Sequence, residues 1–114
     1  MTRTIFEKIL AREIPAKIVY EDDDVLAFHD INPQAPTHVL VIPKTKVEGF
    51  KDLQKQDPAW IGQWMSRVAH VASLLGLDQE GYRVVVNQGD FGGQSVAYIH
   101  AHILGGRPLM WPPG

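Results

Sequence analysis

The sequence of 114 residues contains no cysteine and carries little excess charge. The absence of cysteine excludes disulfide scaffolds, iron–sulfur clusters, thiol catalysis and every zinc site that uses a cysteine ligand. Eleven Lys and Arg residues against thirteen Asp and Glu residues give a formal net charge of −2. The chain therefore lacks the broad cationic field that captures nucleic acid or anionic lipid, and we expect neither as a partner. A small mononucleotide remains compatible with this composition.

Long hydrophobic runs are also missing, because charged residues or prolines interrupt the apolar stretches. The sequence predicts no membrane span, and its N-terminus has no apolar segment that resembles a secretory signal. We therefore expect a cytoplasmic protein. A length of 114 residues, with 45% hydrophobic residues, is typical of one compact domain, so we assign residues 1–114 to a single domain.

Two segments have the residue pattern of a helix. Residues 4–14 place apolar side chains at helical spacing, behind a threonine N-cap and before a proline. The second helix is longer, with Asp57 as its N-cap, Pro58 at the first helical position and Gly76 at its end. Apolar residues recur along it at spacings of three and four, so we expect this face to pack against the core.

Five segments have the character of β-strands: residues 18–20, 25–28, 37–43, 82–87 and 95–104. Short turns join the first two strands and the last two, whereas the long helix lies between the third and the fourth. This grouping favours an antiparallel sheet over the parallel sheet of βαβ units. The sequence therefore predicts an α+β fold with a five-stranded antiparallel sheet, one long helix and one short helix.

The last strand indicates a binding site. Side chains alternate between the two faces of a strand, so Tyr98, His100 and His102 should share one face. Alternate Cα atoms lie about 7 Å apart, close enough for the three side chains to contact one small ligand. The glycine-rich segment 92–95 precedes them and offers backbone N–H groups, an amide and a hydroxyl, which suit a phosphate.

A metal site is the alternative interpretation of the two histidines, because His-x-His on a strand can converge on zinc or copper. His38 would serve as a third ligand if its strand lay beside the last one. A loop with many hydrogen-bond donors suits an anion better than a cation, so we expect no metal and no cofactor. The common dinucleotide and ATPase patterns, Gly-x-Gly-x-x-Gly and Walker A, are absent.

Short motifs follow one another along almost the whole chain. They include Ala27-Phe-His-Asp-Ile31, Pro33-Gln-Ala-Pro-Thr-His38, Gly92-Gly-Gln-Ser-Val96, His100-x-His102 and Trp111-Pro-Pro-Gly114. In this order they resemble the histidine triad (HIT) family, and within it the branch of histidine triad nucleotide-binding proteins. The resemblance implies a homodimer whose sheets join across the interface. It also implies hydrolysis of purine nucleoside phosphoramidates and related nucleoside monophosphate conjugates through a nucleotidylated histidine.

The resemblance assigns three catalytic histidines. The family's nucleophile corresponds to His100, and the other two site histidines correspond to His102 and His38. The first histidine of the family's signature is replaced by Tyr98. A tyrosine ordinarily has a pKa of about 10, so it cannot act as a protonated cation at neutral pH. A noncatalytic purine-nucleotide-binding module, impaired by this replacement, is therefore the alternative function.

The same correspondence assigns the residues that hold the nucleotide. The residues expected at the phosphate are Asn87, Gly93, Gln94, Ser95 and Val96. The residues expected at the ribose and the base are Asp30, Phe6, Ile9, Phe28, His29 and Ile31, with Asp30 accepting hydrogen bonds from the ribose hydroxyls. Trp111 is expected to reach the site of the partner subunit, which would make dimerisation part of substrate specificity.

Overall fold

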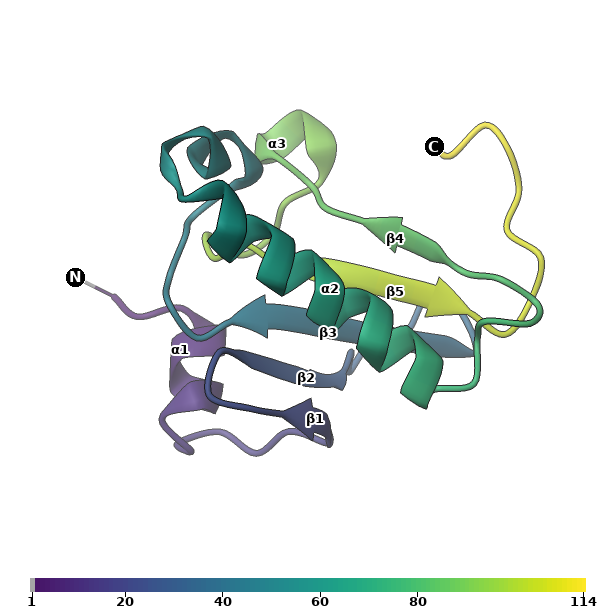
Figure 1. The fold of residues 1–114 in the computed structure, drawn as a ribbon, viewed down its shortest axis with the longest axis horizontal. Coiled ribbons are helices and arrows are strands. Elements are labelled where there is room, and N and C mark those ends of the chain that lie inside the picture. Colours follow the sequence, from purple (N-terminus) through teal and green to yellow (C-terminus); the bar gives the residue numbers. More distant parts are fainter. Residues whose placement is uncertain (1) are drawn as a thin grey trace.

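Five antiparallel strands form one sheet in the order β1-β2-β3-β5-β4 in the computed structural model, which describes residues 2–114 (Figure 1). The strands are β1 (Ile18–Glu21), β2 (Val25–His29), β3 (Thr37–Pro43), β4 (Arg83–Val85) and β5 (Ala101–Gly105). The predicted α+β fold with a five-stranded antiparallel sheet is confirmed.

Helices cover the two faces of this sheet unequally. The helices are α1 (Ile5–Leu10), the 3₁₀ helix η1 (Phe50–Lys55), α2 (Pro58–Leu74) and the single turn α3 (Gly89–Gly92). The long helix α2 crosses one face of the sheet, and the short helix α1 lies near one end of it (Figure 1). The sequence predicted α1 and α2 but not η1 or α3.

The central strand β3 is buried on both faces because its side chains alternate between two apolar clusters. Val39 and Val41 belong to the cluster packed with α2, whereas Leu40 and Ile42 belong to the cluster packed with α1. A strand that is covered on both sides requires a continuous apolar run, and residues 39–42 provide one. The first group, with its α2 partners, is called the α2-face core below, and the second the α1-face core.

The prediction of α2 rests on capping residues that the structure contains. Asp57 accepts a hydrogen bond from the Ala59 N–H (2.9 Å), and Pro58 starts α2. The helix ends at Leu74, and Gly76 follows in the left-handed conformation at φ 75°. These are the start and stop signals that identified this helix in the sequence.

Helix α1 is shorter than the predicted segment 4–14. Thr4 and Glu7 form a reciprocal capping box at its start, as Thr4 was expected to do. The helix ends at Leu10 because the backbone then turns, with Arg12 in the left-handed conformation at φ 62°. The Glu13 N–H donates back to the Lys8 carbonyl (2.9 Å), which closes the C-terminus before Pro15 is reached.

The last strand also starts later than predicted. Pairing with β3 begins at Ala101, so residues 95–100 precede the strand although they were assigned to it. In this stretch the Ile99 N–H donates to the Val47 carbonyl (2.6 Å), which draws the backbone away from the sheet pattern. Strand β4 is likewise shorter than the predicted residues 82–87. Within residues 2–114, the helices are too short or too polar to cross a membrane.

Candidate functional site

A pocket of about 260 Å³ lies beside α1, over the α1 face of the sheet. It collects residues that the sequence analysis assigned to separate parts of a nucleotide site. The assigned residues that line it are Phe6, Ile9, Phe28, His29, Asp30, Ile31, Ser95, Val96, His100 and His102. The lining is mostly apolar and ends in a few convergent polar groups, which is typical of a small-molecule site.

Three histidines meet at the polar end of this pocket. His100, just before β5, and His102, on β5, line the pocket, whereas His38, on β3, lines the adjoining pocket. His38 lies on β3, and His102 lies on β5, which pairs with β3. Nε2 of His38 and Nδ1 of His102 are 2.9 Å apart. The rings of His100 and His102 are 4.9 Å apart between centroids. The predicted orientation of His100 and His102 toward one pocket agrees with this placement.

His100 is held by one polar contact and one aromatic contact. Its Nδ1 donates to the backbone carbonyl of Tyr98 (2.7 Å), because a carbonyl oxygen can only accept. The ring of Phe6 packs edge-on against it, 4.9 Å away between centroids. The ring is only 5% exposed, and this burial lowers the pKa of His100. His100 is therefore neutral at pH 7, with the lone pair on Nε2.

His102 is neutral for the same reason. Burial, reinforced by the neighbouring rings of His100 and His38, lowers the pKa of His102 to about 4. Its Nε2 is buried and has no hydrogen-bond partner within residues 2–114. A buried polar atom without a partner is costly unless a ligand completes its hydrogen bond.

Asp30 connects the pocket to His38. One carboxylate oxygen accepts from the backbone N–H of Asn32 (2.8 Å), which fixes the side chain in a tight turn after β2. The other oxygen lies 3.5 Å from Nε2 of His38. Ligand atoms of Asp30, His38 and His102 all lie within 4.8 Å of one another, so this group could also hold a metal ion.

Tyr98 does not line the pocket, contrary to the prediction that it shares a ligand-facing surface with His100 and His102. Its ring is 1% exposed and packs edge-on against Phe6 within the α1-face core. Its hydroxyl donates to the carbonyl of Pro43. Burial raises the pKa of Tyr98 to about 12. Tyr98 is therefore a structural residue whose backbone carbonyl, and not its side chain, contacts the site.

Gln94 was assigned to the phosphate, but its side chain braces the glycine-rich loop. Its Oε1 accepts from the Gly89 N–H (2.9 Å), and its Nε2 donates to the carbonyls of Glu48 (2.7 Å) and Val96 (3.0 Å). These bonds occupy the amide and join α3 to the segment before η1. Nothing in the sequence indicated this brace, because it depends on how the loop folds.

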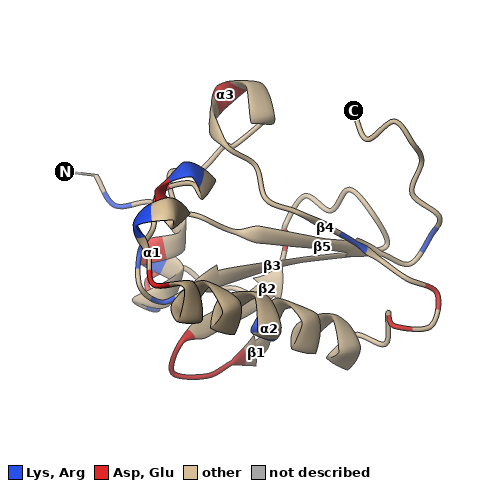
Figure 2. Ribbon diagram, turned by 45° about the horizontal axis from the view of Figure 1, so that its top comes forward, with Lys and Arg blue, Asp and Glu red and all other residues tan. Residues whose placement is uncertain are grey.

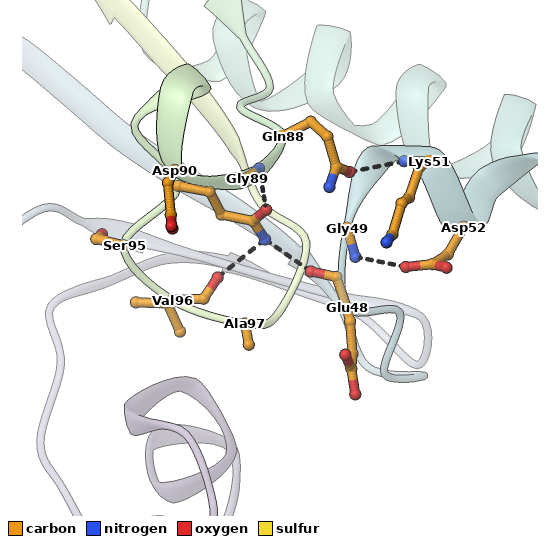
Figure 3. Close-up of a pocket in the computed structure, with 11 residues that line it drawn as sticks. Glu48, Gly49, Lys51, Asp52, Gln88, Gly89, Asp90, Ser95, Val96 and Ala97 are labelled. Carbon is orange, nitrogen blue, oxygen red and sulfur yellow. Dashed lines mark hydrogen bonds between the residues drawn. The ribbon is translucent and has the colours of Figure 1, made fainter.

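A second pocket of about 320 Å³ lies between η1 and α3, on the other side of this brace (Figure 3). Ser95 and Val96 line both pockets, so they form the wall between them. The carboxylates of Asp52 and Asp90 also line the second pocket.

Three further assigned residues, Asn87, Gly93 and Trp111, also lie outside the histidine pocket. Asn87 and Gly93 lie side by side near α3, where a Cβ on Gly93 would be 4.0 Å from the Asn87 amide nitrogen. Trp111 is 79% exposed, and the guanidinium of Arg83 lies over its ring at 5.9 Å. Arg83 also donates to the Met110 carbonyl (2.8 Å), which holds this segment beside β4.

The charged side chains near the pocket are largely paired with one another. Figure 2 shows basic and acidic residues interspersed around α1. Among the ion pairs there are Arg12 with Glu21 and Lys46 with Glu7. Exposed pairs of this kind contribute little stability. Because each basic side chain of these pairs lies beside an acidic one, these residues do not form a cationic patch that could bind an anionic partner surface.

Comparison with known proteins gives a consistent result. Residues 11–109 match the family model of the HIT domain. A protein of Synechococcus elongatus described as an uncharacterized HIT-like protein is 52% identical over 111 residues, covering 97% of this chain and 96% of its own. The 14 kDa zinc-binding protein of Zea mays is 54% identical over 114 residues, covering 97% and 88%. The crystal structure of a HIT family hydrolase from Legionella pneumophila superposes with a TM-score of 0.93 at 46% identity, covering 98% and 100%.

Proposed function

This chain belongs to the HIT domain family, and on this premise we propose that it hydrolyses purine nucleoside phosphoramidates and related nucleoside monophosphate conjugates. One observation supports the proposal above all: neutral His100 keeps a free lone pair on Nε2 while its Nδ1 is bound to the Tyr98 carbonyl. A neutral imidazole held in one orientation is an effective nucleophile at pH 7.

The proposed reaction proceeds in two displacements at phosphorus. Nε2 of His100 attacks the α-phosphorus, a phosphorus–nitrogen bond to the imidazole forms, and the bond to the leaving amine breaks. The amine leaves with a proton taken up from water, and a second water molecule then cleaves the phosphoimidazole. This second step gives the nucleoside monophosphate, restores neutral His100 and releases one proton. His102 would stabilise a phosphoryl oxygen, and His38, in contact with His102 at 2.9 Å, would assist proton transfer through it.

The pocket supplies a place for each part of the nucleotide. The aromatic rings of Phe6 and Phe28 would contact the purine, and the Asp30 carboxylate would accept the ribose hydroxyls. Ser95 and Val96 lie at the histidine end, where the backbone before β5 can meet the phosphate. Assignments of Asn87, Gly93 and Gln94 to the phosphate stay predictions, as does the cytoplasmic location.

We also infer a homodimer joined along β4. This strand is at the edge of the sheet that residues 2–114 form, so one row of its backbone groups has no strand partner there, and Val84 on it is 41% exposed. The contact of Arg83 with Trp111 holds the C-terminal segment beside the same edge. In such a dimer, Trp111 of one subunit would approach the pocket of the other. Light scattering should give twice the chain mass.

The test of the proposed reaction is a His100→Asn variant incubated with a purine phosphoramidate. We expect release of nucleoside monophosphate to fall by at least about 1,000-fold, while binding of the monophosphate changes little. His70→Asn is the matched control, because His70 lies exposed on α2 and outside the pocket. Undiminished release by the His100 variant would exclude this nucleophile. Binding without release by the unaltered protein would favour the noncatalytic module instead.

Zinc binding is the second candidate function, because Asp30, His38 and His102 bring three ligand atoms together and a relative is named a zinc-binding protein. Elemental analysis after dialysis tests it directly. One zinc per chain, lost in a His38→Phe variant, would support the metal site.

A further inference from the structure

Gln34 determines which nitrogen of His38 carries its proton. The backbone N–H of Gln34 lies 3.0 Å from Nδ1 of His38. An amide N–H can only donate, so Nδ1 must accept with its lone pair. Burial lowers the pKa of His38, so the ring is neutral at pH 7 and has a single proton. That proton must therefore be on Nε2.

Asp30 requires the same tautomer from the other side of the ring. A carboxylate oxygen of Asp30 lies 3.5 Å from Nε2 of His38. A lone pair on this nitrogen would face the negative oxygen and be repelled, whereas an N–H is attracted to it. Two independent neighbours, a main-chain donor and a carboxylate, thus agree on the position of the proton.

The position of this proton determines the tautomer of His102. Because Nε2 of His38 carries the proton, Nδ1 of His102, 2.9 Å away, must accept it as a hydrogen bond. Neutral His102 then carries its own proton on Nε2. This is the buried nitrogen that has no partner within residues 2–114, on a ring that lines the pocket.

We propose that the backbone N–H of Gln34 is a positioning group that sets the tautomers of His38 and His102, so that His102 offers the pocket a buried N–H donor. The Tyr98 carbonyl acts in the opposite sense on His100, whose Nδ1 donates and whose Nε2 keeps a lone pair. Two main-chain groups of opposite polarity therefore give two adjacent imidazoles opposite tautomers. The pocket therefore contains one nucleophile, Nε2 of His100, and one hydrogen-bond donor for a ligand oxygen, the Nε2–H of His102.

The hydrogen bonds from Gln34 to His38 and from His38 to His102 also disfavour a metal ion at this site. A cation between Asp30, His38 and His102 would need a lone pair on Nε2 of His38. The proton of a neutral His38 would then move to Nδ1, where it would point at the N–H of Gln34. The same backbone group that orders the hydrogen bonds makes this cluster a poor cation site, and the ligand it suits is an anion with acceptor oxygens.

Long-range proton–nitrogen NMR correlations of the imidazole rings test the proposal on the ligand-free full chain at pH 7. In the unaltered protein we expect protons on Nε2 of His38, Nε2 of His102 and Nδ1 of His100. A proton on Nδ1 of His102, or a mixture of both tautomers there, would overturn the proposal. Because no substrate is used, this result is independent of whether the protein hydrolyses phosphoramidates.

Three variants test which group sets the tautomers of His38 and His102. His38→Phe removes the donor to His102, and we expect the His102 ring to become a mixture of tautomers. Gln34→Ala retains the backbone N–H, so the wild-type pattern should persist, whereas Gln34→Pro lacks it and His38 should lose its single tautomer. An unchanged His102 in the His38→Phe variant would show that another group sets the proton, and the proposal would fail.

Discussion

The two faces of the sheet use the same strands for different purposes. On the α2 face, alternate residues such as Val39, Val41 and Ile103 form a wholly apolar core under a helix of 17 residues. On the α1 face, the intervening strand positions include His38 and His102, with His100 just before β5, and the covering helix has only six residues. The short helix leaves part of its face open, and the pocket occupies that opening.

Alternate residues of one strand face opposite sides of the sheet, so residues that stabilise the fold alternate with residues that line the pocket. Each strand residue belongs to one face, so neighbouring substitutions should have unlike consequences. A substitution on the α2 face should affect folding alone. A substitution on the α1 face should affect the pocket, and folding only where it reaches the α1-face core.

The largest expected effect on this comparison comes from Ile103→Ala. Ile103 is fully buried in the α2-face core, and its neighbour His102 lines the pocket. The cavity should lower the free energy of unfolding by about 2 to 5 kcal/mol, as measured by urea denaturation. At low denaturant, where the variant stays folded, the Kd for a nucleoside monophosphate should be unchanged. A large loss of affinity would mean that the two faces are not independent.

Tyr98→Phe tests whether Tyr98 acts as a structural residue on the α1 face. The substitution leaves the Pro43 carbonyl without the hydroxyl donor, so the free energy of unfolding should fall by about 1 to 2 kcal/mol. Turnover should stay within about threefold, because the backbone carbonyl that holds His100 remains. Tyr82→Phe, on the surface, is the control and should change neither quantity. A large loss of turnover in Tyr98→Phe would show that the Tyr98 hydroxyl takes part in the reaction.

The histidines should also give the α1 face a dependence on pH. Burial lowers the pKa of His38, His100 and His102, the last from 6.5 to about 4. Below about pH 6.5 the unfolded chain binds protons that the folded chain does not, so stability is lost as the pH falls. We expect a loss of roughly 2 kcal/mol between pH 7 and pH 5 from these groups. In the His102→Asn variant, the free energy of unfolding from denaturation experiments should fall less steeply as the pH decreases. An equal dependence on pH in the two proteins would assign the effect to other groups.

The smallest expected effect is that of Thr4→Ala, which removes the N-cap of α1. An N-cap is worth roughly 1 kcal/mol, and here the loss should fray the helix that carries Phe6 and Ile9. We expect hydrogen exchange of α1 to increase and nucleotide affinity to weaken by about two- to fivefold. Asp57→Ala, the equivalent change on α2, should lower stability without weakening nucleotide affinity. Equal losses of affinity in the two variants would show that the pocket does not depend on α1 more than on α2.

Sequence patterns predicted those features that depend on local signals. The caps of α2, the five strands and the shared orientation of His100 and His102 follow from spacing and propensity. The resemblance to the HIT family added the correspondence of His38 to the site, and the structure places this residue against His102.

Features that depend on tertiary context could not be predicted in this way. Alternation places Tyr98 on the same side as His100, but it does not say that α1 covers that end and buries the ring. The brace by Gln94 and the contact of the Gln34 N–H with His38 depend on loop conformations that no periodic pattern specifies. The sequence therefore located the histidines but not the main-chain groups that set their protons.

The register of β3 protects the chemistry as well as the fold. His38 lies opposite Leu104 on β5, and Leu40 lies opposite His102. A slip of one residue would carry every side chain of β3 to the other side, turning His38 toward α2 and exposing valines to the pocket. Such a register shift would disrupt both apolar cores and the contact between His38 and His102. The pairing that buries the valines of β3 is therefore the same pairing that brings His38 to His102.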